Sequence, residues 1–237
     1  MAVLKVDLHT HSADDPVDVI PHSTRDLIDR AASLGFHALA ITLHEQPLEL
    51  HPHLGYASDR GVVLIPGVER TIEGRHVLLL NFPNPKVCVR SFSDLERLRR
   101  HHPEGLVVAP HAFFPLSSCL GRLTYRHAEL FDAVEYNAFY TRLVNFNRGA
   151  IRWSHTTGKP LVGNSDAHRL SLLGTTFSLV EAEPDASSIC LAIKAGKTRV
   201  HSRPLTVLKA ATYFGSLTVA GRRDPEASAN GEPVRVA

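Results

Sequence analysis

The sequence predicts an α/β fold in which short buried strands alternate with helices. Apolar runs rich in valine, leucine and isoleucine recur along the chain, as in strands that are covered on both faces. Helical stretches with capping residues and closing glycines separate these runs. Hydrophobic residues make up 43% of the 237 residues, which is enough for one large core. About seven β/α units favour a closed or nearly closed TIM-like barrel, with an open doubly wound sheet as the alternative.

The first half of the chain predicts four strands and one clear helix. Residues 3–8 alternate as a strand. A helix follows between Ser23 and Gly35, because Ser23 and Asp26 form a capping box, apolar positions recur at helical spacing and glycine suits the end. Three further apolar runs predict strands at residues 37–42, 61–69 and 76–82.

The second half continues the alternation. Ser93 and Glu96 form a capping box that predicts a helix ending near His101. Further strands are expected at residues 106–109, 133–137, 161–163 and 176–180, and further helices at residues 125–131, 143–157 and 185–195. No internal repeat is visible, so we expect a single domain over residues 1–220. Residues 221–237 are polar and predict a disordered tail.

Composition excludes several classes of protein. The 26 basic and 24 acidic residues leave a formal net charge of +2, which disfavours a long nucleic-acid partner. The three cysteines form no CxxC pair, so neither a disulfide framework nor a thiolate zinc site is indicated. No apolar run approaches the ~18 residues that span a membrane, and no signal peptide is apparent. We therefore expect a cytoplasmic protein without membrane contact; its oligomeric state stays open.

Histidines and carboxylates follow the predicted strands at the point where each strand ends. These strand ends are Asp7-Leu8-His9-Thr10-His11, Thr42-Leu43-His44-Glu45, Gly67-Val68-Glu69, Pro110-His111 and Asn164-Ser165-Asp166-Ala167-His168. The carboxyl ends of barrel strands converge on one face, so these side chains are expected to meet. His9 and His11 at i and i+2 point to the same side of their strand. Imidazoles with carboxylates suit zinc, manganese or iron, and this many candidate ligands predicts about two or three ions.

The remaining histidines are interpreted differently. A lone histidine is more often a surface residue or a hydrogen-bonded core residue than a metal ligand. This interpretation applies to His22, His37, His51, His53, His101, His102, His127 and His155.

The order of these motifs resembles the PHP family, named for its polymerase and histidinol phosphatase members. The matching pieces are DLHTHS (7–12), ITLHE (41–45), PGVE (66–69), His76, APH (109–111) and NSDAH (164–168). The resemblance runs from about residue 3 to residue 202. It implies a distorted barrel of seven β/α units and a site that commonly holds three metal ions.

The resemblance also implies a set of metal ligands by position. His9, His11, Glu69 and Asp166 would hold one ion; Glu69, His76 and His111 a second; His44 and His168 a third. Asp15 is the candidate that completes the third site, with Asp18 and Asp14 as alternatives. Leu43 departs from the family pattern, which usually has an aspartate there, and its presence weakens the expected orientation of neighbouring ligands.

Three further residues are candidates for catalysis or substrate binding. Glu135 ends a predicted strand and is a candidate proton-transfer group. Arg75 and Arg169 lie beside motif residues and are candidates for binding phosphate oxygens. The resulting hypothesis is a phosphoesterase that cleaves a small phosphorylated metabolite, nucleotide or short oligonucleotide with metal-activated hydroxide. The alternatives are an amidohydrolase, a TatD-like nuclease and a non-catalytic metal-binding module.

Overall fold

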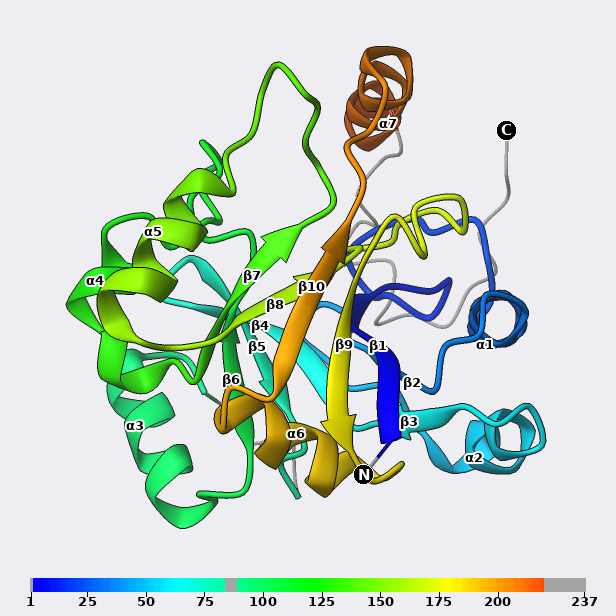
Figure 1. Ribbon diagram of the computed structural model, residues 1–237, viewed down its shortest axis with the longest axis horizontal. Coiled ribbons are helices and arrows are strands. Elements are labelled where there is room, and N and C mark those ends of the chain that lie inside the picture. The colour runs from blue at the N-terminus through cyan, green and yellow to red at the C-terminus, as the bar shows by residue number, and fades with distance from the viewer. Residues whose placement is uncertain (1, 84–88, 220–237) are drawn as a thin grey trace, which may run out of the picture.

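The computed structural model describes residues 2–83 and 89–219 (Figure 1). Cys88 and the tail predicted at residues 221–237 lie outside the described residues. The strands are β1 (Ala2–Thr10), β2 (Ala38–Ile41), β3 (Val63–Ile65), β4 (Gly67–Ile72), β5 (Arg75–Leu80), β6 (Leu106–Ala109), β7 (Ala133–Asn137), β8 (Leu161–Asn164), β9 (Thr176–Ala182) and β10 (Thr198–Ser202). The helices are α1 (Thr24–Ser33), α2 (His51–Ser58), α3 (Phe92–His101), α4 (Leu123–Arg126), the short η1 (Ala128–Leu130), α5 (Arg148–Thr157), α6 (Ala186–Lys194) and α7 (Val207–Val219).

The strands form two five-stranded sheets, in the orders β10-β9-β1-β2-β3 and β4-β5-β6-β7-β8. The mixed α/β fold is therefore confirmed, but the described residues show no single closed parallel barrel. β1 pairs in parallel with β2 and antiparallel with β9, and β5 is antiparallel to both of its neighbours. Figure 1 shows α3, α4 and α5 on one flank of the sheets, with α1 and α2 on the other.

The departure from a parallel barrel begins at Pro66. The sequence predicts one strand over residues 61–69, whereas the structure ends β3 before Pro66 and starts β4 after it. Proline has no N–H for the hydrogen-bond ladder, which explains the break. β4 then returns directly as β5 through Glu73 and Gly74, whose φ angles are 48° and 76°. Such a two-residue connection joins only antiparallel strands.

The two sheets face a common core that α6 closes at one end. Apolar side chains of β1, β5, β6 and β9 form this core together with Ile189 and Ile193 of α6, all of them buried. The sheets approach closely where β8 meets β9, since the backbone N–H of Gly163 donates to Ser178 Oγ over 2.8 Å. A Cβ on Gly163 would lie 2.7 Å from the carbonyl oxygen of Phe177. Glycine is thus required at this contact.

At the opposite end of the core, backbone bridges join the two sheets beside the strand ends. His44 pairs with Glu69 and Thr10 pairs with Ala167, both in parallel orientation. These pairings draw the carboxyl ends of β1, β2 and β8 towards β4, which is how residues distant in sequence come to share one site.

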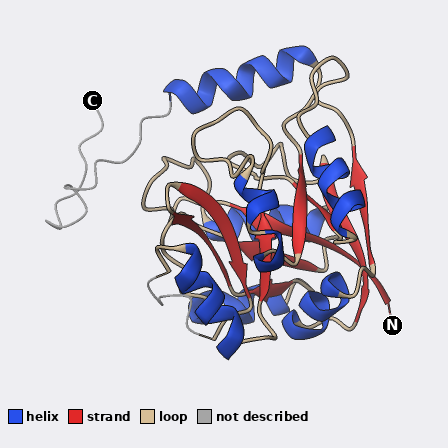
Figure 2. Cartoon of the chain, turned by 90° about the vertical axis from the view of Figure 1, so that its left-hand side faces the viewer, coloured by secondary structure: helices blue, strands red, loops and turns tan. Residues whose placement is uncertain are grey.

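Helix α1 begins as predicted, with Ser23 and Asp26 forming the capping box. Helix α3 does not. Its capping box consists of Ser91 and Asp94, so the prediction of Ser93 as the cap was wrong by two residues. The helix predicted at 125–131 is divided into α4 and η1, and the one predicted at 143–157 starts at Arg148. Helices α2 and α7 and strand β10 were not predicted. Figure 2 shows α7 lying across the outside of the molecule.

Replacing Ser91 with alanine should destabilise the protein by about 1 kcal/mol, the usual value for a lost N-cap. Its hydroxyl accepts a hydrogen bond from the Asp94 backbone N–H over 3.1 Å. Ser93→Ala is the matched control, because Ser93 is exposed and does not cap the helix. Urea denaturation measures both free energies of unfolding. An equal or larger loss in Ser93→Ala would contradict the observed cap.

No helix in residues 2–83 and 89–219 combines the length and apolar character needed to cross a bilayer.

Candidate metal centre

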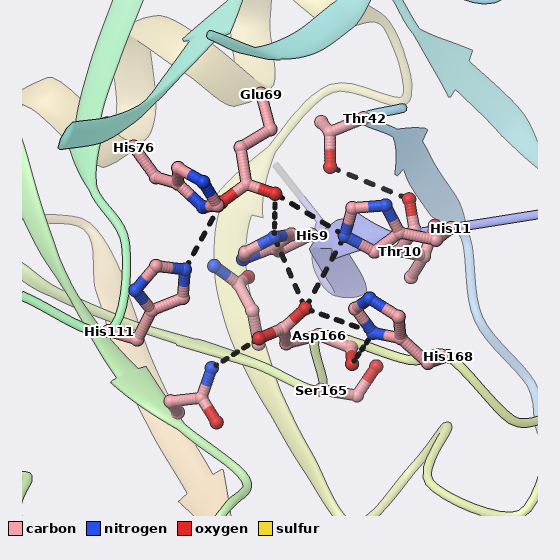
Figure 3. A network of polar contacts seen from close by, with 12 residues as sticks. His9, Thr10, His11, Thr42, Glu69, His76, His111, Ser165, Asp166 and His168 are labelled. Atoms are coloured by element: carbon pink, nitrogen blue, oxygen red, sulfur yellow. Dashed lines mark hydrogen bonds and ion pairs between the residues drawn. The ribbon is translucent and has the colours of Figure 1, made fainter. Parts of the chain in front are cut away.

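The side chains predicted as metal ligands converge at one end of the two sheets, and Figure 3 shows those other than Asp15 and His44. His9 lies in β1, Glu69 in β4 and His76 in β5. The others follow strand ends in short loops: His11 and Asp15 after β1, His44 after β2, His111 after β6, and Asp166 and His168 after β8. This is the convergence that the strand-end pattern predicts.

Glu69 lies at the middle of the cluster, with five imidazole nitrogens around its two oxygens. Its Oε1 is 2.7 Å from His76 Nδ1 and 3.1 Å from His111 Nε2. Its Oε2 is 3.2 Å from His9 Nε2, 3.3 Å from His44 Nε2 and 3.5 Å from His11 Nε2. The two oxygens of this one carboxylate thus face two different groups of histidines, the arrangement needed to bridge two cations.

Asp166 is the second shared carboxylate. Its Oδ1 lies 3.3 Å from His9 Nε2, 3.4 Å from His11 Nε2 and 3.5 Å from His168 Nδ1. Asp166 has a φ of 50°, and the neighbouring strand-end residue His111 has a φ of 29°. Left-handed backbone conformations are strained in residues other than glycine and cluster at functional sites.

Asp15 lies behind two of the histidines. Its Oδ2 is 3.0 Å from Nδ1 of His11 and 3.0 Å from Nδ1 of His44, while the Nε2 atoms of both rings face Glu69. Asp15 Oδ1 accepts the backbone N–H groups of Val17 and Asp18, which fix the carboxylate. Asp15 therefore keeps each Nδ1 protonated and leaves each Nε2 lone pair for a cation.

The alternatives to Asp15 occupy different places. Asp18 Oδ2 lies 3.2 Å from His168 Nε2, so Asp18 contacts the cluster through His168. Asp14 is exposed and accepts a hydrogen bond from the Thr24 hydroxyl over 2.7 Å. Of the three aspartates, Asp15 and Asp18 reach the cluster and Asp14 points away from it.

These side chains form overlapping groups suited to metal ions. The groups are His9, His11 and Asp166; His9, Glu69 and His111; His44, Glu69 and His76; and His11, His44 and His168, each with ligand atoms within 4.8 Å of one another. Nε2 of His11 is buried and makes no hydrogen bond within the described structure. A buried imidazole lone pair without a partner is costly unless a cation takes it. The residues present therefore fit divalent metal binding.

The electrostatics of the cluster support the same conclusion. Burial favours the neutral form of Glu69, yet His9 and His76 hold its pKa well below the ordinary value. Burial opposes the charge on His44, but Glu69 and Asp15 raise its pKa to about 9. Burial and the nearby His168 lower the pKa of His11, which keeps that ring neutral. Although burial opposes their charge, nearby carboxylates also raise the pKa values of His9, His111 and His168, so protons on these rings would offset negative charge that bound cations would otherwise neutralise.

Glu135 is placed behind His9 rather than at an open surface. Its side chain is fully buried, and Oε2 lies 2.8 Å from His9 Nδ1. Asn137 donates to Glu135 Oε1 over 2.5 Å and to Asp166 Oδ2 over 3.1 Å. Glu135 and Asn137 thus link His9 to Asp166 through hydrogen bonds. Asn137 was not predicted; its place at the end of β7 was the available signal.

Cys119 makes a contact with the cluster that sequence reasoning missed, and His22 contacts its backbone. Sγ of Cys119 lies 3.3 Å from His111 Nδ1, on the side of the ring away from Glu69. The His22 ring donates to the His11 backbone carbonyl, with Nε2 2.9 Å from the oxygen. His22 thus fits the hydrogen-bonded core histidine that was expected. No sequence pattern pointed to Cys119.

The two predicted substrate-binding arginines lie away from the cavity at the cluster. This cavity, of about 550 Å³, is lined by His44, Glu69, His76, His111, Asp166 and His168 among others, but by neither arginine. The Arg75 guanidinium donates to the backbone carbonyls of Ser117 and Cys119, so it holds the loop that forms one wall. Arg169 is exposed. The sequence places both arginines beside motif residues, but this did not determine the direction of their long side chains.

Leu43 occupies an apolar environment. Its side chain is 3% exposed and belongs to the outer hydrophobic cluster with Leu39 and Ile41 of β2. Its backbone carbonyl accepts the N–H of Glu69 over 3.1 Å. The leucine is consistent with this apolar packing.

Asp15→Asn should weaken metal binding by about 10- to 100-fold without abolishing it, the usual cost of losing a residue that orients a ligand. Asparagine can still accept a hydrogen bond but no longer carries the charge that orders two histidines. Asp14→Asn is the matched control. Metal titration of the stripped protein, followed by calorimetry, measures both. If Asp14→Asn had the larger effect, the placement of Asp15 behind His11 and His44 would be wrong.

The family model for the PHP-associated region matches residues 144–198. No curated protein matches the chain. PsfC from Pseudomonas syringae is 20% identical with a TM-score of 0.67, and the alignment covers 92% of this chain and 100% of that one.

Two larger structures are also similar. A two-domain protein from Bacteroides vulgatus, containing a predicted PHP-like metal-dependent phosphoesterase, is 18% identical with a TM-score of 0.64. The alignment covers 85% of this chain, which spans only 65% of that protein. Endonuclease Q in complex with a 27-mer duplex is 16% identical with a TM-score of 0.57, over 90% of this chain and 67% of that one.

The endonuclease conflicts with one expectation. That protein of similar fold is in complex with a 27-mer duplex, which conflicts with the expectation that long nucleic acid is an unlikely partner. The structural neighbours establish the fold, and the family-model match supplies sequence evidence in agreement with the ordered motifs. The resemblance to the PHP family drawn from the motifs is thereby confirmed, with the family-model match lying over residues 144–198.

Proposed function

We propose that this protein is a metal-dependent phosphoesterase acting on a small phosphorylated metabolite, a nucleotide or a short oligonucleotide. The observation that carries the proposal is the pair of shared carboxylates, Glu69 and Asp166, surrounded by imidazole nitrogens at 2.7–3.5 Å beside an open cavity. A cavity of about 550 Å³ is within the range of small-molecule sites.

The donor set determines which ions the site would hold. Its mixture of neutral imidazoles and carboxylates suits zinc, manganese or iron, and its overlapping groups suit about two or three ions. Bound ions would lower the pKa of water and offset charge on phosphoryl oxygens. In this proposal His9, His11, His44, Glu69, His76, His111, Asp166 and His168 are the ligands.

Other side chains would position those ligands. Asp15 was expected as a ligand of the third ion; we assign it a positioning role instead, because its Oδ2 faces Nδ1 of His11 and His44. Glu135 orders His9 through a contact at Nδ1. Glu135 lies behind its histidine, so we assign it a positioning role in place of direct proton transfer to substrate. Hydrolysis adds water across the P–O bond: the water oxygen joins phosphorus, and the released ester oxygen takes a proton.

An amidohydrolase activity is the main alternative. Within the described part of the chain no lysine lines the cavity, which removes the usual source of a carbamylated metal bridge. The non-catalytic alternative rests on Leu43 alone, and the apolar packing of that residue accounts for it without loss of any ligand.

The test is hydrolysis of a broad phosphoester panel by protein that has been stripped of metal and then reloaded with zinc, manganese or iron. We expect release of phosphate or nucleotide by at least one reloaded form and none by the stripped form. Hydrolysis of amides or lactones without any phosphoester cleavage would favour the alternative. Metal binding without turnover on either panel would favour the non-catalytic module.

A further inference from the structure

The cavity at the metal centre has an apolar wall. Val17, Phe114, Leu116 and Phe139 line it together with the histidines and carboxylates. They come from loops after β1, β6 and β7, and so face the same space from different strand ends. The ring of Phe114 also packs against Phe146, with the centroids 5.4 Å apart, which supports this wall from behind.

Leu116 shows that part of this wall is available to a ligand. Its side chain is 59% exposed although it borders the cavity. The loop that carries Leu116 is held in place by β5. The Arg75 side chain donates to the carbonyls of Ser117 and Cys119. The His76 backbone N–H donates to the Ser118 carbonyl over 2.8 Å. An exposed leucine on a braced loop beside a polar cluster offers apolar contact to whatever enters.

The same cavity lacks fixed positive charge. Among the described residues that line it, none is lysine or arginine, whereas Asp18 and Glu45 lie on its border. Arg70 is nearby, but its guanidinium donates to the Glu45 backbone carbonyl over 2.5 Å and faces a separate cavity. Bound ions would therefore be the main source of positive charge, and a second phosphoryl group would meet carboxylates instead of cations.

We propose that the preferred substrate is a phosphate ester that carries one phosphoryl group on an alcohol with an aromatic or bulky apolar body. This inference rests on the proposed phosphoesterase function and narrows its substrate class. The phosphoryl group lies at the metal centre, and the apolar body contacts Leu116, Phe114 and Phe139. Polyphosphates and esters of small polar alcohols gain nothing from this wall.

The test compares 2-phenylethyl phosphate with glycerol 1-phosphate, two alkyl esters of similar intrinsic reactivity, using manganese-loaded protein and measuring phosphate release. We expect kcat/KM to be at least tenfold higher for the phenyl ester, a typical discrimination for an apolar pocket. Inorganic pyrophosphate should be a poor substrate. Equal or reversed preference between the two esters would overturn the proposal.

Matched variants locate the effect. Leu116→Ala and Phe139→Ala should each reduce the ratio of kcat/KM for the phenyl ester to that for glycerol 1-phosphate several-fold. Leu143→Ala is the control, because Leu143 is 83% exposed and does not line the cavity. Leu116→Lys should improve turnover of pyrophosphate relative to the phenyl ester. An unchanged preference in both alanine variants would contradict the role of this wall.

Binding separates this inference from the proposed function. Calorimetry with 2-phenylethylphosphonate and 2-hydroxyethylphosphonate, which cannot be hydrolysed, needs no turnover. If no ester were cleaved, the phosphoesterase function would fail; tighter binding of the phenyl phosphonate, lost in Leu116→Ala, would still support the apolar wall. Equal binding of the two phosphonates would overturn it.

Discussion

Replacing Glu69 with glutamine should remove most of the bound metal and lower turnover by on the order of a thousandfold, about 4 kcal/mol of transition-state stabilisation. The substitution keeps the shape of the side chain but replaces a carboxylate oxygen with an N–H donor and removes the negative charge. Because both Glu69 oxygens face histidine groups, within 3.5 Å at most, one substitution should affect more than one ion. The loss of metal and turnover should therefore exceed the loss caused by replacing a residue that contacts only one ion.

Elemental analysis and phosphate release measure the two effects together. Glu129→Gln is the matched control, since Glu129 is exposed on η1 and lies outside the candidate metal groups. Circular dichroism of the metal-free forms verifies that Glu69→Gln is folded. Full metal content in that variant would show that Glu69 is not a shared ligand.

The double substitution His9→Ala with His11→Ala should abolish both metal binding and turnover. His9 belongs to two of the candidate groups and His11 to two, and they share the group with Asp166. Both side chains are fully buried, so water cannot easily replace them as ligands. Removing two imidazoles also leaves Glu69 and Asp166 close together with less positive charge around them, which raises the cost of holding both ionised.

A second double variant controls for the loss of two histidines. His101→Ala with His102→Ala removes two rings at the end of α3, far from the cluster in the fold and outside every candidate metal group. It should retain metal content and activity. Full activity of the His9 and His11 double variant, confirmed to be folded, would refute the assignment of the site.

The sequence predicted the convergence of the site better than the shape of the fold. His9, His11, His111 and Asp166 lie at or just after strand ends, where side chains of a layered α/β fold meet, whereas Glu69 was expected at a strand end but lies within β4. Whether the sheet closes depends instead on pairings such as β4 with β5, which Pro66 and the turn at Glu73 and Gly74 determine. Those signals are local, and the barrel prediction did not use them.

Other misses have equally specific causes. Ser91 precedes α3 and Ser93 lies in its first turn, and Ser93 was wrongly assigned as the cap. Arg75 was expected to bind phosphate oxygens, but the direction of its side chain depends on a carbonyl in a loop 42 residues later. The choice among three aspartates in one loop depended on backbone turns around Asp15 that spacing alone does not specify.

The most direct test of this account is the metal content of the purified, dialysed protein, measured by elemental analysis after reconstitution with zinc, manganese or iron. We expect about two or three tightly held ions per chain, as the overlapping ligand groups indicate. Less than one ion per folded chain with every metal would contradict the central claim that these histidines and carboxylates form a metal centre.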